Sequence, residues 1–286
     1  MTVFDKMAAL EARLQPIRQS GKKIGFVPTM GALHQGHLSL LETSKNQADC
    51  TVVSIFVNPT QFNNPEDFRL YPSHPEHDLY ILDQAGCDLV FTPSAEEIYP
   101  TGLKQDTSYE LGYLETIMEG KFRPGHFQGV CQVVDRLLNI VNPDILFLGQ
   151  KDLQQCKVIE KLLALTKRTD RTKLVICPTM REPDGLAMSS RNLRLKPEDR
   201  EKASWIYKGL VDLKNACGQS SFDYERTSVI KRLEENGFLV EYLELVDSDT
   251  LEILDDWNTS KSLSICIAAS LSNIRLIDNM ILHTFQ

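Results

Sequence analysis

Two histidines stand three residues apart in the segment PTMGALHQGH, at the point where a helix should begin. Helices usually begin with Ser, Thr, Asp or Asn as the N-cap, so a pair of imidazoles there suggests another purpose. At this spacing His34 and His37 can point toward one spot, where the helix dipole and backbone N–H groups also favour an anion. Gly31 and Gly36 allow close backbone approach. The pattern favours a phosphate site, although a lone histidine would more often be structural.

Two further polar segments follow runs that read as strands. VNPTQF brings Gln61, which can exchange hydrogen bonds with a small polar substrate but, taken alone, fits an ordinary loop equally well. FLGQKDLQQ brings Gly149 for access, Lys151 as a cation, Asp152 as a helix cap and Gln155 one turn further on. Lys151 could also be a solvated charge, and it becomes a candidate phosphate contact because ligands bind at the carboxyl ends of parallel strands.

Two loops complete the set of residues able to bind an anion. MREPDGLAMSSRN (180–192) combines hydroxyls and a guanidinium, which suits closure over a polyphosphate, although an interdomain linker could have the same composition. FRPGHFQGV adds Arg123 and His126, the latter weak evidence by itself. Walker A, GxGxxG and HExxH motifs are missing from the sequence, as is a credible Ser-His-Asp set. The chemistry indicated is positioning and charge stabilisation, as nucleotidyl transfer requires.

The elements that must position these residues alternate along the first 180 residues. Apolar runs predict strands at 22–27 (ending at Pro28), 50–57, 87–91, 144–149 and 173–178. Helical patterns are expected at about 4–19, 36–47, 74–85, 129–141 and 152–166. This alternation predicts a Rossmann-like, doubly wound parallel sheet.

The pattern changes beyond residue 183. Helices are expected at about 197–216 and 222–236, followed by strands at 238–247, 263–268 and 274–282. We therefore predict two domains, 1–183 for nucleotide and substrate binding and 184–286 as a smaller α+β closing domain. The stretches 58–76 and 98–127 lack periodicity, which in a compact domain is typical of ligand-covering loops.

Bulk composition restricts the partners and the compartment. A net charge of −8 and a pI near 5.3 give no electrostatic case for nucleic acid or an anionic membrane. The sequence has no apolar run of about 18 residues and no secretory signal. Its seven cysteines are scattered without a CxxC pair, which favours buried free thiols in a reducing cytoplasm.

Five segments, PTMGALHQGH, FVNPTQF, FRPGHFQGV, GQKDLQQ and DGLAMSSRN, stand in the order typical of pantoate–β-alanine ligases (pantothenate synthetases). YLELVD and RLIDN extend the likeness, so the chain resembles this family of the HxGH nucleotidyltransferase superfamily from about residue 22 to 280. The resemblance implies ATP with Mg²⁺, a cytoplasmic homodimer and a place in vitamin B5 synthesis. It also implies that pantoate is adenylated and that β-alanine then displaces AMP.

The resemblance carries roles to particular residues. His37 would be the general acid, and His34, Lys151 and Arg191 would balance phosphate charge during catalysis. Gln61 and Gln155 would hold pantoate, with Gln61 also near β-alanine. The metal ligands are not defined; Asp78 is a candidate, with phosphates and water holding the rest of the Mg²⁺ shell. The expected ATP contacts are Met30, Gly31, Ala32, Leu33, His34, Gln35, Gly36, His37, Gly149, Gln150, Lys151, Asp152, Met180, Met188, Ser189, Ser190 and Arg191.

Two positions depart from the family pattern, which commonly has Glu at the place of Gln150 and Arg at that of Ser73. Both changes bear on affinity or loop contacts more than on the chemistry. Two other readings stay open at this point. Another HxGH enzyme, such as a phosphopantetheine adenylyltransferase, would leave the nucleotide on its product, and a nucleotide-sensing module would bind ATP without turnover.

Overall fold

The computed structural model describes residues 1–103, 107–257 and 262–282. Residues 104–106 fall inside the predicted irregular stretch 98–127 and lie outside the described residues. The chain divides into two compact units: residues 1–150 with 154–178, and residues 151–153 with the chain from Thr179 onward. Each unit is described by itself.

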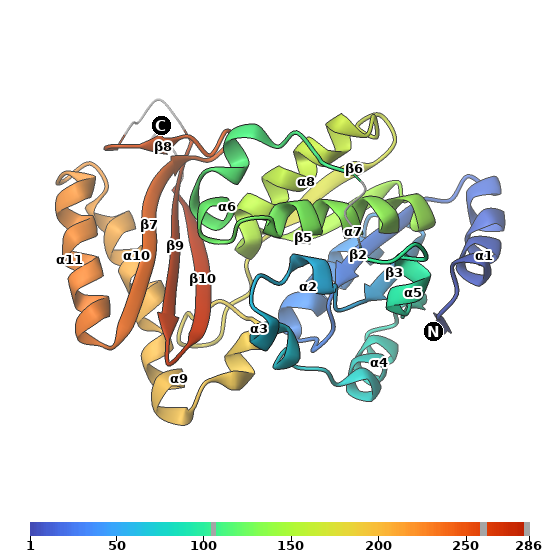
Figure 1. Ribbon diagram of the computed structural model, residues 1–286, viewed down its shortest axis with the longest axis horizontal. Coiled ribbons are helices and arrows are strands. Elements are labelled where there is room, and N and C mark those ends of the chain that lie inside the picture. Colours follow the sequence, from blue (N-terminus) through green and yellow to red (C-terminus); the bar gives the residue numbers. More distant parts are fainter. Residues whose placement is uncertain (104–106, 258–261, 283–286) are drawn as a thin grey trace. The chain divides into compact units, whose positions relative to one another are not determined.

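The first unit contains a six-stranded sheet in which all neighbours are parallel. Its strand order is β1-β4-β3-β2-β5-β6, so the strands that follow β2 in the sequence lie on both sides of it (Figure 1). This confirms the doubly wound sheet predicted from the alternating pattern. The strands are β1 (Thr2–Phe4), β2 (Ile24–Thr29), β3 (Cys50–Ile55), β4 (Leu89–Phe91), β5 (Ile145–Gly149) and β6 (Lys173–Cys177).

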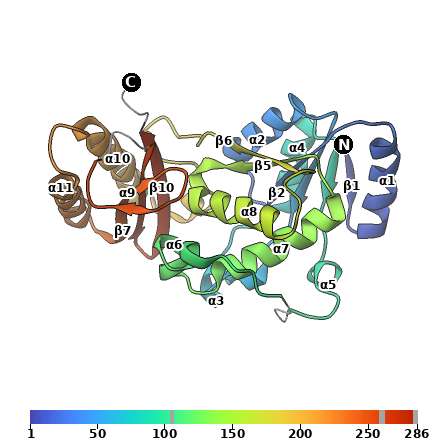
Figure 2. The ribbon, with the colours of Figure 1, turned by 90° about the horizontal axis from the view of Figure 1, so that it is seen from above.

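Helices cover both faces of this sheet (Figure 2). On one face α1 (Met7–Gln19), α7 (His126–Val141) and α8 (Leu153–Leu165) enclose a core that includes Phe26 and Val52. On the other face α2 (Gln35–Lys45) and α4 (Pro75–Gln84) pack over Val27, Val53 and Phe147. Successive strand residues thus enter opposite cores, which explains why these strands read as continuous apolar runs.

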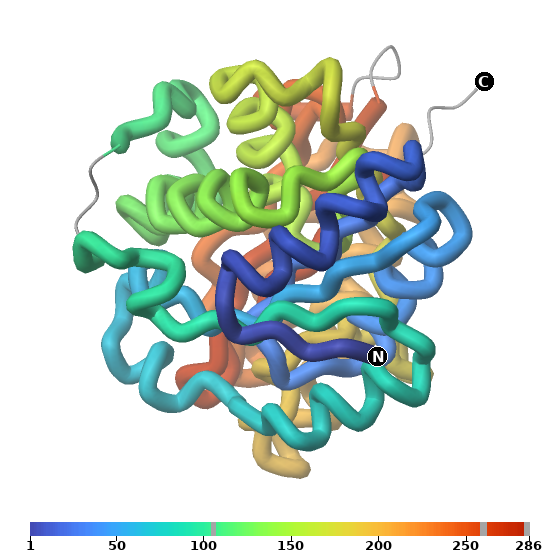
Figure 3. The backbone as a smooth tube through the Cα atoms, turned by 90° about the vertical axis from the view of Figure 1, so that its right-hand side faces the viewer, coloured from blue at the N-terminus to red at the C-terminus, as the bar shows by residue number. Residues whose placement is uncertain are grey.

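Two details of this sheet differ from the sequence-based expectation. Residues 2–4 form strand β1, which pairs with β4 at the sheet edge (Figure 3), whereas Phe4 was expected to begin the first helix. The second difference is that β2 continues through Pro28 to Thr29. A proline is tolerated there because β5 pairs with β2 only at Gly25 and Phe26, so the ladder on that side has already ended.

The two stretches predicted to lack periodicity contain short helices. Residues 58–76 include η1 (Pro59–Gln61) and α3 (Pro65–Arg69). The other stretch is preceded by α5 (Ala95–Ile98) and includes η2 (Gly112–Glu115) and α6 (Met118–Phe122). These elements are too short to show a helical hydrophobic period in the sequence.

The second unit is a four-stranded antiparallel sheet of order β10-β9-β7-β8, with β7 (Phe238–Asp247), β8 (Ile253–Leu254), β9 (Leu263–Leu271) and β10 (Ile274–Leu282). Helices α10 (Trp205–Ala216) and α11 (Phe222–Glu235) pack on this sheet and share a core with its inner residues (Figure 1). The expected helix 197–216 is interrupted at Ser204, which separates α9 (Pro197–Ala203) from α10. The α+β character predicted for this part is confirmed.

The seven cysteines are all buried and free, as their scattered positions predicted. Burial raises the pKa of the Cys87 and Cys131 thiols to about 12 in each case, so both are protonated at neutral pH. None of the helices in the described ranges is long and apolar enough to cross a membrane.

Candidate active site

The two histidines of the HxGH segment form the cap of helix α2. His34 is the N-cap residue, with φ −142° and ψ 177°, and its Nδ1 accepts the Gly36 N–H at 3.1 Å. His37 returns the interaction, because its Nδ1 accepts the His34 N–H at 3.3 Å. This reciprocal arrangement is a capping box built from imidazoles instead of the usual Ser and Glu. Helix α2 is therefore capped by histidines at the position where Ser, Thr, Asp or Asn is usual.

These hydrogen bonds define which ring nitrogens carry protons. Because both Nδ1 atoms accept backbone N–H groups, a neutral ring at either position carries its proton on Nε2. The two rings lie with their centroids 4.1 Å apart. Each imidazole thus uses one nitrogen to stabilise the helix start and has a second nitrogen of donor character. Two adjacent N–H donors at a helix N-terminus suit a phosphate group.

A buried carboxylate fixes the loop that leads into this helix. Asp78 of α4 is 1 % exposed, and its two oxygens accept the N–H groups of Ala32 and Leu33, each at 2.8 Å. The loop needs such support because Gly31 and the non-glycine Ala32 both have positive φ, 79° and 48°. Any side chain at Gly31 would also meet Asp78, since a Cβ there would lie 2.9 Å from Oδ2.

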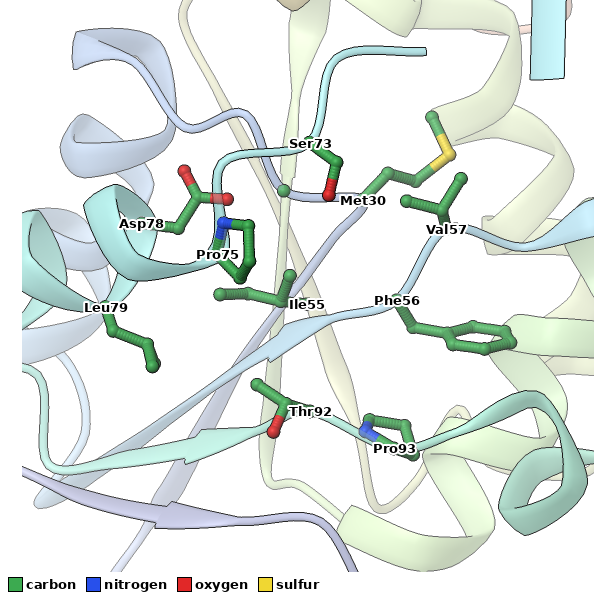
Figure 4. A pocket seen from close by; sticks show the side chains of 11 residues that line it. Met30, Ile55, Phe56, Val57, Ser73, Pro75, Asp78, Leu79, Thr92 and Pro93 are labelled. Atoms are coloured by element: carbon green, nitrogen blue, oxygen red, sulfur yellow. The ribbon is translucent and has the colours of Figure 1, made fainter. Parts of the chain in front are cut away.

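A pocket of about 240 Å³ opens beside this loop, at the carboxyl ends of three neighbouring strands. Met30 and Gly31 follow β2, Phe56 and Val57 follow β3, and Thr92 and Pro93 follow β4. Figure 4 shows Ser73 on the chain that enters α4 and Asp78 on the first turn of that helix, with the Met30 thioether near Val57. In doubly wound folds this end of the sheet is where ligands bind. Ser73 therefore stands in the wall of the pocket.

Gln61 lies beside the same loop, and contacts with neighbouring side chains hold its amide in place. It is 9 % exposed, its Oε1 accepts from Asn58 Nδ2 at 3.1 Å, and its Nε2 lies 3.1 Å from the Met30 Sδ. Asn58 is itself fixed by the Tyr99 hydroxyl, which donates to its Oδ1 at 2.7 Å. Sequence reasoning missed Asn58 and Tyr99, and only the Asn-Pro turn before Gln61 hinted at the former.

His126 supports Gln61 through the backbone. Its Nδ1–H donates to the Gln61 carbonyl at 2.8 Å, which leaves Nε2 to accept from Arg123 at 3.0 Å. His126 is 5 % exposed and begins helix α7. Gly129, one turn later, allows close approach, since a Cβ there would lie 2.3 Å from the Thr60 carbonyl oxygen. The FRPGHFQGV segment thus positions the turn that carries Gln61.

Neighbouring glutamines at the start of α8 have different environments. Gln154 is 5 % exposed and bridges the α6 region, accepting from Glu119 N–H at 2.9 Å and donating to the Leu114 and Ile117 carbonyls. Gln155 is half-buried, and its side chain makes no hydrogen bond to the described part of the chain. Gln154 is therefore satisfied by the fold, whereas the Gln155 amide is available to a ligand.

The remaining expected ATP contacts fall in two groups. Gly149 ends β5 and Gln150 follows it as the first residue of η3 (Gln150–Asp152), both in the first unit, and a Cβ at Gly149 would meet nothing within 4 Å. In the second unit Lys151 lies 3.7 Å from the Asp152 carboxylate, atom to atom. Arg181 and Ala187 pair as an isolated antiparallel bridge, so residues 181–187 form a small hairpin.

The residues flanking that hairpin were expected at the phosphates. Met180 precedes it and accepts the Met188 N–H at its carbonyl, at 3.0 Å. The Ser189 hydroxyl then accepts the Arg191 N–H at 3.3 Å and caps the short η4 (Ser190–Arg194). Met30 to His37, Gln61 and Asp78 thus lie together in the first unit, whereas Lys151 and Met180 to Arg191 belong to the second.

A doubly wound parallel sheet with an HxGH helix start and a pocket at the strand ends is typical of nucleotide-binding enzymes. The particular family follows from comparison: the model of the family described as pantoate-beta-alanine ligase matches residues 2–281, so the chain belongs to that family. The chain is 44% identical to the pantothenate synthetase of Flavobacterium psychrophilum over 282 residues, 98% of this chain and 99% of the relative. It is 41% identical to that of Cytophaga hutchinsonii over 285 residues, 99% of each chain.

Comparison with solved structures supports the same family assignment. Pantothenate synthetase from Thermus thermophilus superposes with a TM-score of 0.89 at 39% identity, covering 98% of this chain and 99% of that one. The ligase from Francisella tularensis, solved with β-γ ATP and β-alanine, gives 0.80 at 38% identity, covering 98% and 97%. The protein is thus an enzyme that joins pantoate to β-alanine and makes pantothenate.

Proposed function

We propose that this ligase works in two steps through a pantoyl adenylate. The pantoate carboxylate attacks the α-phosphorus of ATP in line with departing pyrophosphate, and the β-alanine amine then displaces AMP from the mixed anhydride. The observation that carries this proposal is the imidazole capping box, which pairs two Nε2–H donors with a helix N-terminus. No side chain is needed as a covalent nucleophile.

The residues share the work as follows. His37 takes the general-acid position, where its Nε2–H donates a hydrogen bond toward the phosphate oxygens, and His34 adds a second hydrogen bond. Lys151 and Arg191 balance the negative charge that grows as pyrophosphate departs. Met30 to His37, Gly149 to Asp152, Met180 and Met188 to Arg191 contact ATP. Because these groups act by position and charge, their effect depends on how firmly the fold holds them.

Mg²⁺ accompanies ATP and, when bound, neutralises phosphate charge. The side chains fit a metal held mainly by phosphates and water, because both Asp78 oxygens already accept backbone N–H groups. Within the described ranges no group of three or more His, Cys, Asp or Glu side chains could hold a metal ion. Asp78 therefore acts first as the anchor of the loop, and a metal bond to it would compete with that contact.

Gln61 and Gln155 bind pantoate, and Gln61 also lies near β-alanine. Gln155→Ala should raise the KM for pantoate about tenfold, because an amide that hydrogen-bonds the substrate is removed, while ATP affinity measured by calorimetry stays close to the parent value. Gln154→Ala is the matched control, since its amide bonds only the fold: it should lower the melting temperature and leave the pantoate KM unchanged. Equal damage to ATP affinity by Gln155→Ala would misplace the pantoate site.

The C-terminal part, 184–286, closes over the nucleotide and keeps water from the adenylate. The enzyme works as a cytoplasmic homodimer on small molecules, without nucleic acid or membrane. Sedimentation equilibrium of the purified protein tests the dimer, and a single species of about 32 kDa, the mass of one chain, would refute it.

Isotope exchange tests the two-step mechanism. With pantoate and Mg²⁺ but no β-alanine, labelled pyrophosphate should enter ATP, and omission of pantoate should stop the exchange. The complete mixture should release AMP and pyrophosphate with pantothenate. Release of ADP and orthophosphate would indicate an acyl phosphate instead, and a nucleotide retained on the product would indicate another HxGH transferase. ATP binding without any turnover would support a sensing module.

A further inference from the structure

Strand β10 carries a buried polar pair that has no part in the reaction as described so far. Asp278 and Asn279 end the RLIDN segment and are 3 % and 2 % exposed. Buried polar groups are costly unless they are paired, so their partners indicate what they do. Both pair with segments expected to contact ATP.

Asn279 holds the backbone of Lys151. Its side-chain Nδ2 donates to the Lys151 carbonyl at 2.9 Å, across 128 residues of sequence. The contact lies inside the second unit, to which residues 151–153 belong. A fixed carbonyl restricts the backbone at Lys151. It therefore also restricts the direction in which the Lys151 side chain extends from the backbone. The Lys151 side chain is only 18 % exposed, so neighbouring atoms also restrict its movement.

Asp278 holds the hairpin through Arg181. The guanidinium meets the carboxylate with two bonds of 2.6 and 3.0 Å, and the same arginine donates to the Asn279 and Gly185 carbonyls. It also stacks over the Tyr207 ring at 4.6 Å. A bidentate pair of this kind sets orientation as well as distance. Residues 181–187 are thereby fixed just ahead of Met188 to Arg191.

The same carboxylate also acts on Lys151 through its charge. Burial raises the pKa of Asp278, and the charges of Arg181 and Lys151 oppose that rise. The buried carboxylate is thus paired with Arg181 and is also stabilised by the charge of Lys151, from a segment far away in the sequence. Two adjacent residues on β10 thus hold both the Lys151 backbone and the hairpin 181–187.

We propose that Asn279 is a positioning residue for the adenylation step. By holding the Lys151 carbonyl, beside the Asp278–Arg181 pair, it fixes Lys151 and the hairpin relative to one another and directs them toward the phosphates. This inference rests on the proposed contact of Lys151 with ATP. Asn279 itself touches no substrate; it acts through Lys151.

Asn279→Leu removes the donor while keeping a similar volume. Turnover divided by the KM for ATP should fall about tenfold to a hundredfold, since displacement of a charged group by an ångström has effects of that order. The KM for pantoate should stay within twofold. Arg275→Leu is the control from the same strand, because its guanidinium binds Glu241 on β7. This variant should keep its ATP parameters.

A double-mutant cycle separates positioning from general damage to the fold. Parent, Asn279→Leu, Lys151→Ala and the double variant are compared by ATP affinity in calorimetry and by turnover, with Asn279→Ser measured in parallel as a smaller change. If Asn279 acts through Lys151, its substitution should add almost nothing once the ammonium is gone. Full additivity, or unchanged ATP parameters in both Asn279 variants, would overturn the inference. Normal ATP affinity and turnover in Lys151→Ala would instead overturn the proposed role of Lys151.

Discussion

Two segments that contain or adjoin the proposed ATP contacts are held in different ways. The loop from Met30 to His37 is fixed by backbone N–H groups that donate to nearby acceptors, namely the Asp78 carboxylate and the two imidazole Nδ1 atoms. The hairpin 181–187 is fixed by ion pairs, Arg181 with buried Asp278 and Arg200 with partly exposed Asp184. In the first arrangement the acceptors hold the backbone of the loop itself, whereas the second depends on ion pairs between charged side chains.

The difference indicates how each segment should respond to change. A loop tied through its backbone loses its shape when an acceptor is removed, because a buried N–H group without a partner is costly. A hairpin tied by charged side chains can lose one pair and keep the other, and its exposed pair is sensitive to pH and salt. We therefore expect large effects from substitutions in the loop and graded effects in the hairpin.

The largest effect is expected at His37, where fold and chemistry share one ring. His37→Gln keeps a side-chain acceptor at the third helical position, as in an ordinary capping box, but replaces the imidazole and its Nε2–H donor with an amide. Turnover should fall by about 10²–10³, the usual loss for one donor to a transferring group, with little change in melting temperature. His37→Ala should lose the same activity and also about 1 kcal/mol of stability. If His37→Gln kept activity within a few-fold of the parent, the ring would serve the helix alone.

Asp78 comes next. Asp78→Ala removes the carboxylate that accepts the Ala32 and Leu33 N–H groups, so unfolding should become easier by about 2 kcal/mol or more, and ATP affinity should fall with the lost loop conformation. Chemical denaturation and calorimetry measure the two effects.

Asp144 offers the control for Asp78, because its carboxylate accepts a single backbone N–H, that of Ile24, at the opposite end of β2. Asp144→Ala should lower stability without lowering ATP affinity. An Asp78→Ala protein that bound ATP normally would show that the loop keeps its shape unaided.

Local features of both segments could be predicted from the sequence, and their long-range supports could not. The HxGH start was predictable because strand, glycine turn and helix are adjacent in the chain and each leaves a periodic pattern. Asp78 lies 46 residues from the loop it holds, and it could be picked out only as a metal candidate, since a carboxylate in a sequence does not reveal its partner. The bond between Asn279 and Lys151 likewise has no local signal. Strand β1 escaped prediction because three residues show no period.

A smaller effect is expected in the hairpin at Gly185, whose φ is +92°. A Cβ there would lie 1.9 Å from Tyr207 Cδ1, the ring on which Arg181 stacks, so Gly185→Ala combines backbone strain with a steric conflict. Stability should fall by about 2 kcal/mol from overpacking and strain together.

Gly218→Ala is matched to this change, since φ is +77° and a Cβ would meet nothing within 4 Å. It should show the strain without the conflict, and the difference between the two melting temperatures measures the contact with Tyr207. Equal losses would mean that the hairpin yields freely and that Tyr207 does not fix it.

The smallest effect is expected at the exposed end of the hairpin and depends on pH. The Arg200 guanidinium, which donates to Asp184 at 2.5 and 3.3 Å, holds the pKa of that carboxyl below its usual range. A carboxyl whose pKa is lower in the folded state stabilises the fold above its unfolded pKa of about 3.9, and this contribution disappears as pH falls through the folded value. Asp184→Asn should therefore lower stability at pH 6 by about 0.5 kcal/mol, as for other partly exposed pairs. The difference from the parent should shrink below pH 4 and also in 1 M salt, where screening is strong. Parallel thermal melts over this pH range measure it. A difference that stayed constant from pH 6 to pH 3 would show that altered hydrogen bonding at this side chain, which accepts the Leu186 N–H, matters and its charge does not, and the hairpin would then resemble the HxGH loop in depending on a backbone donor.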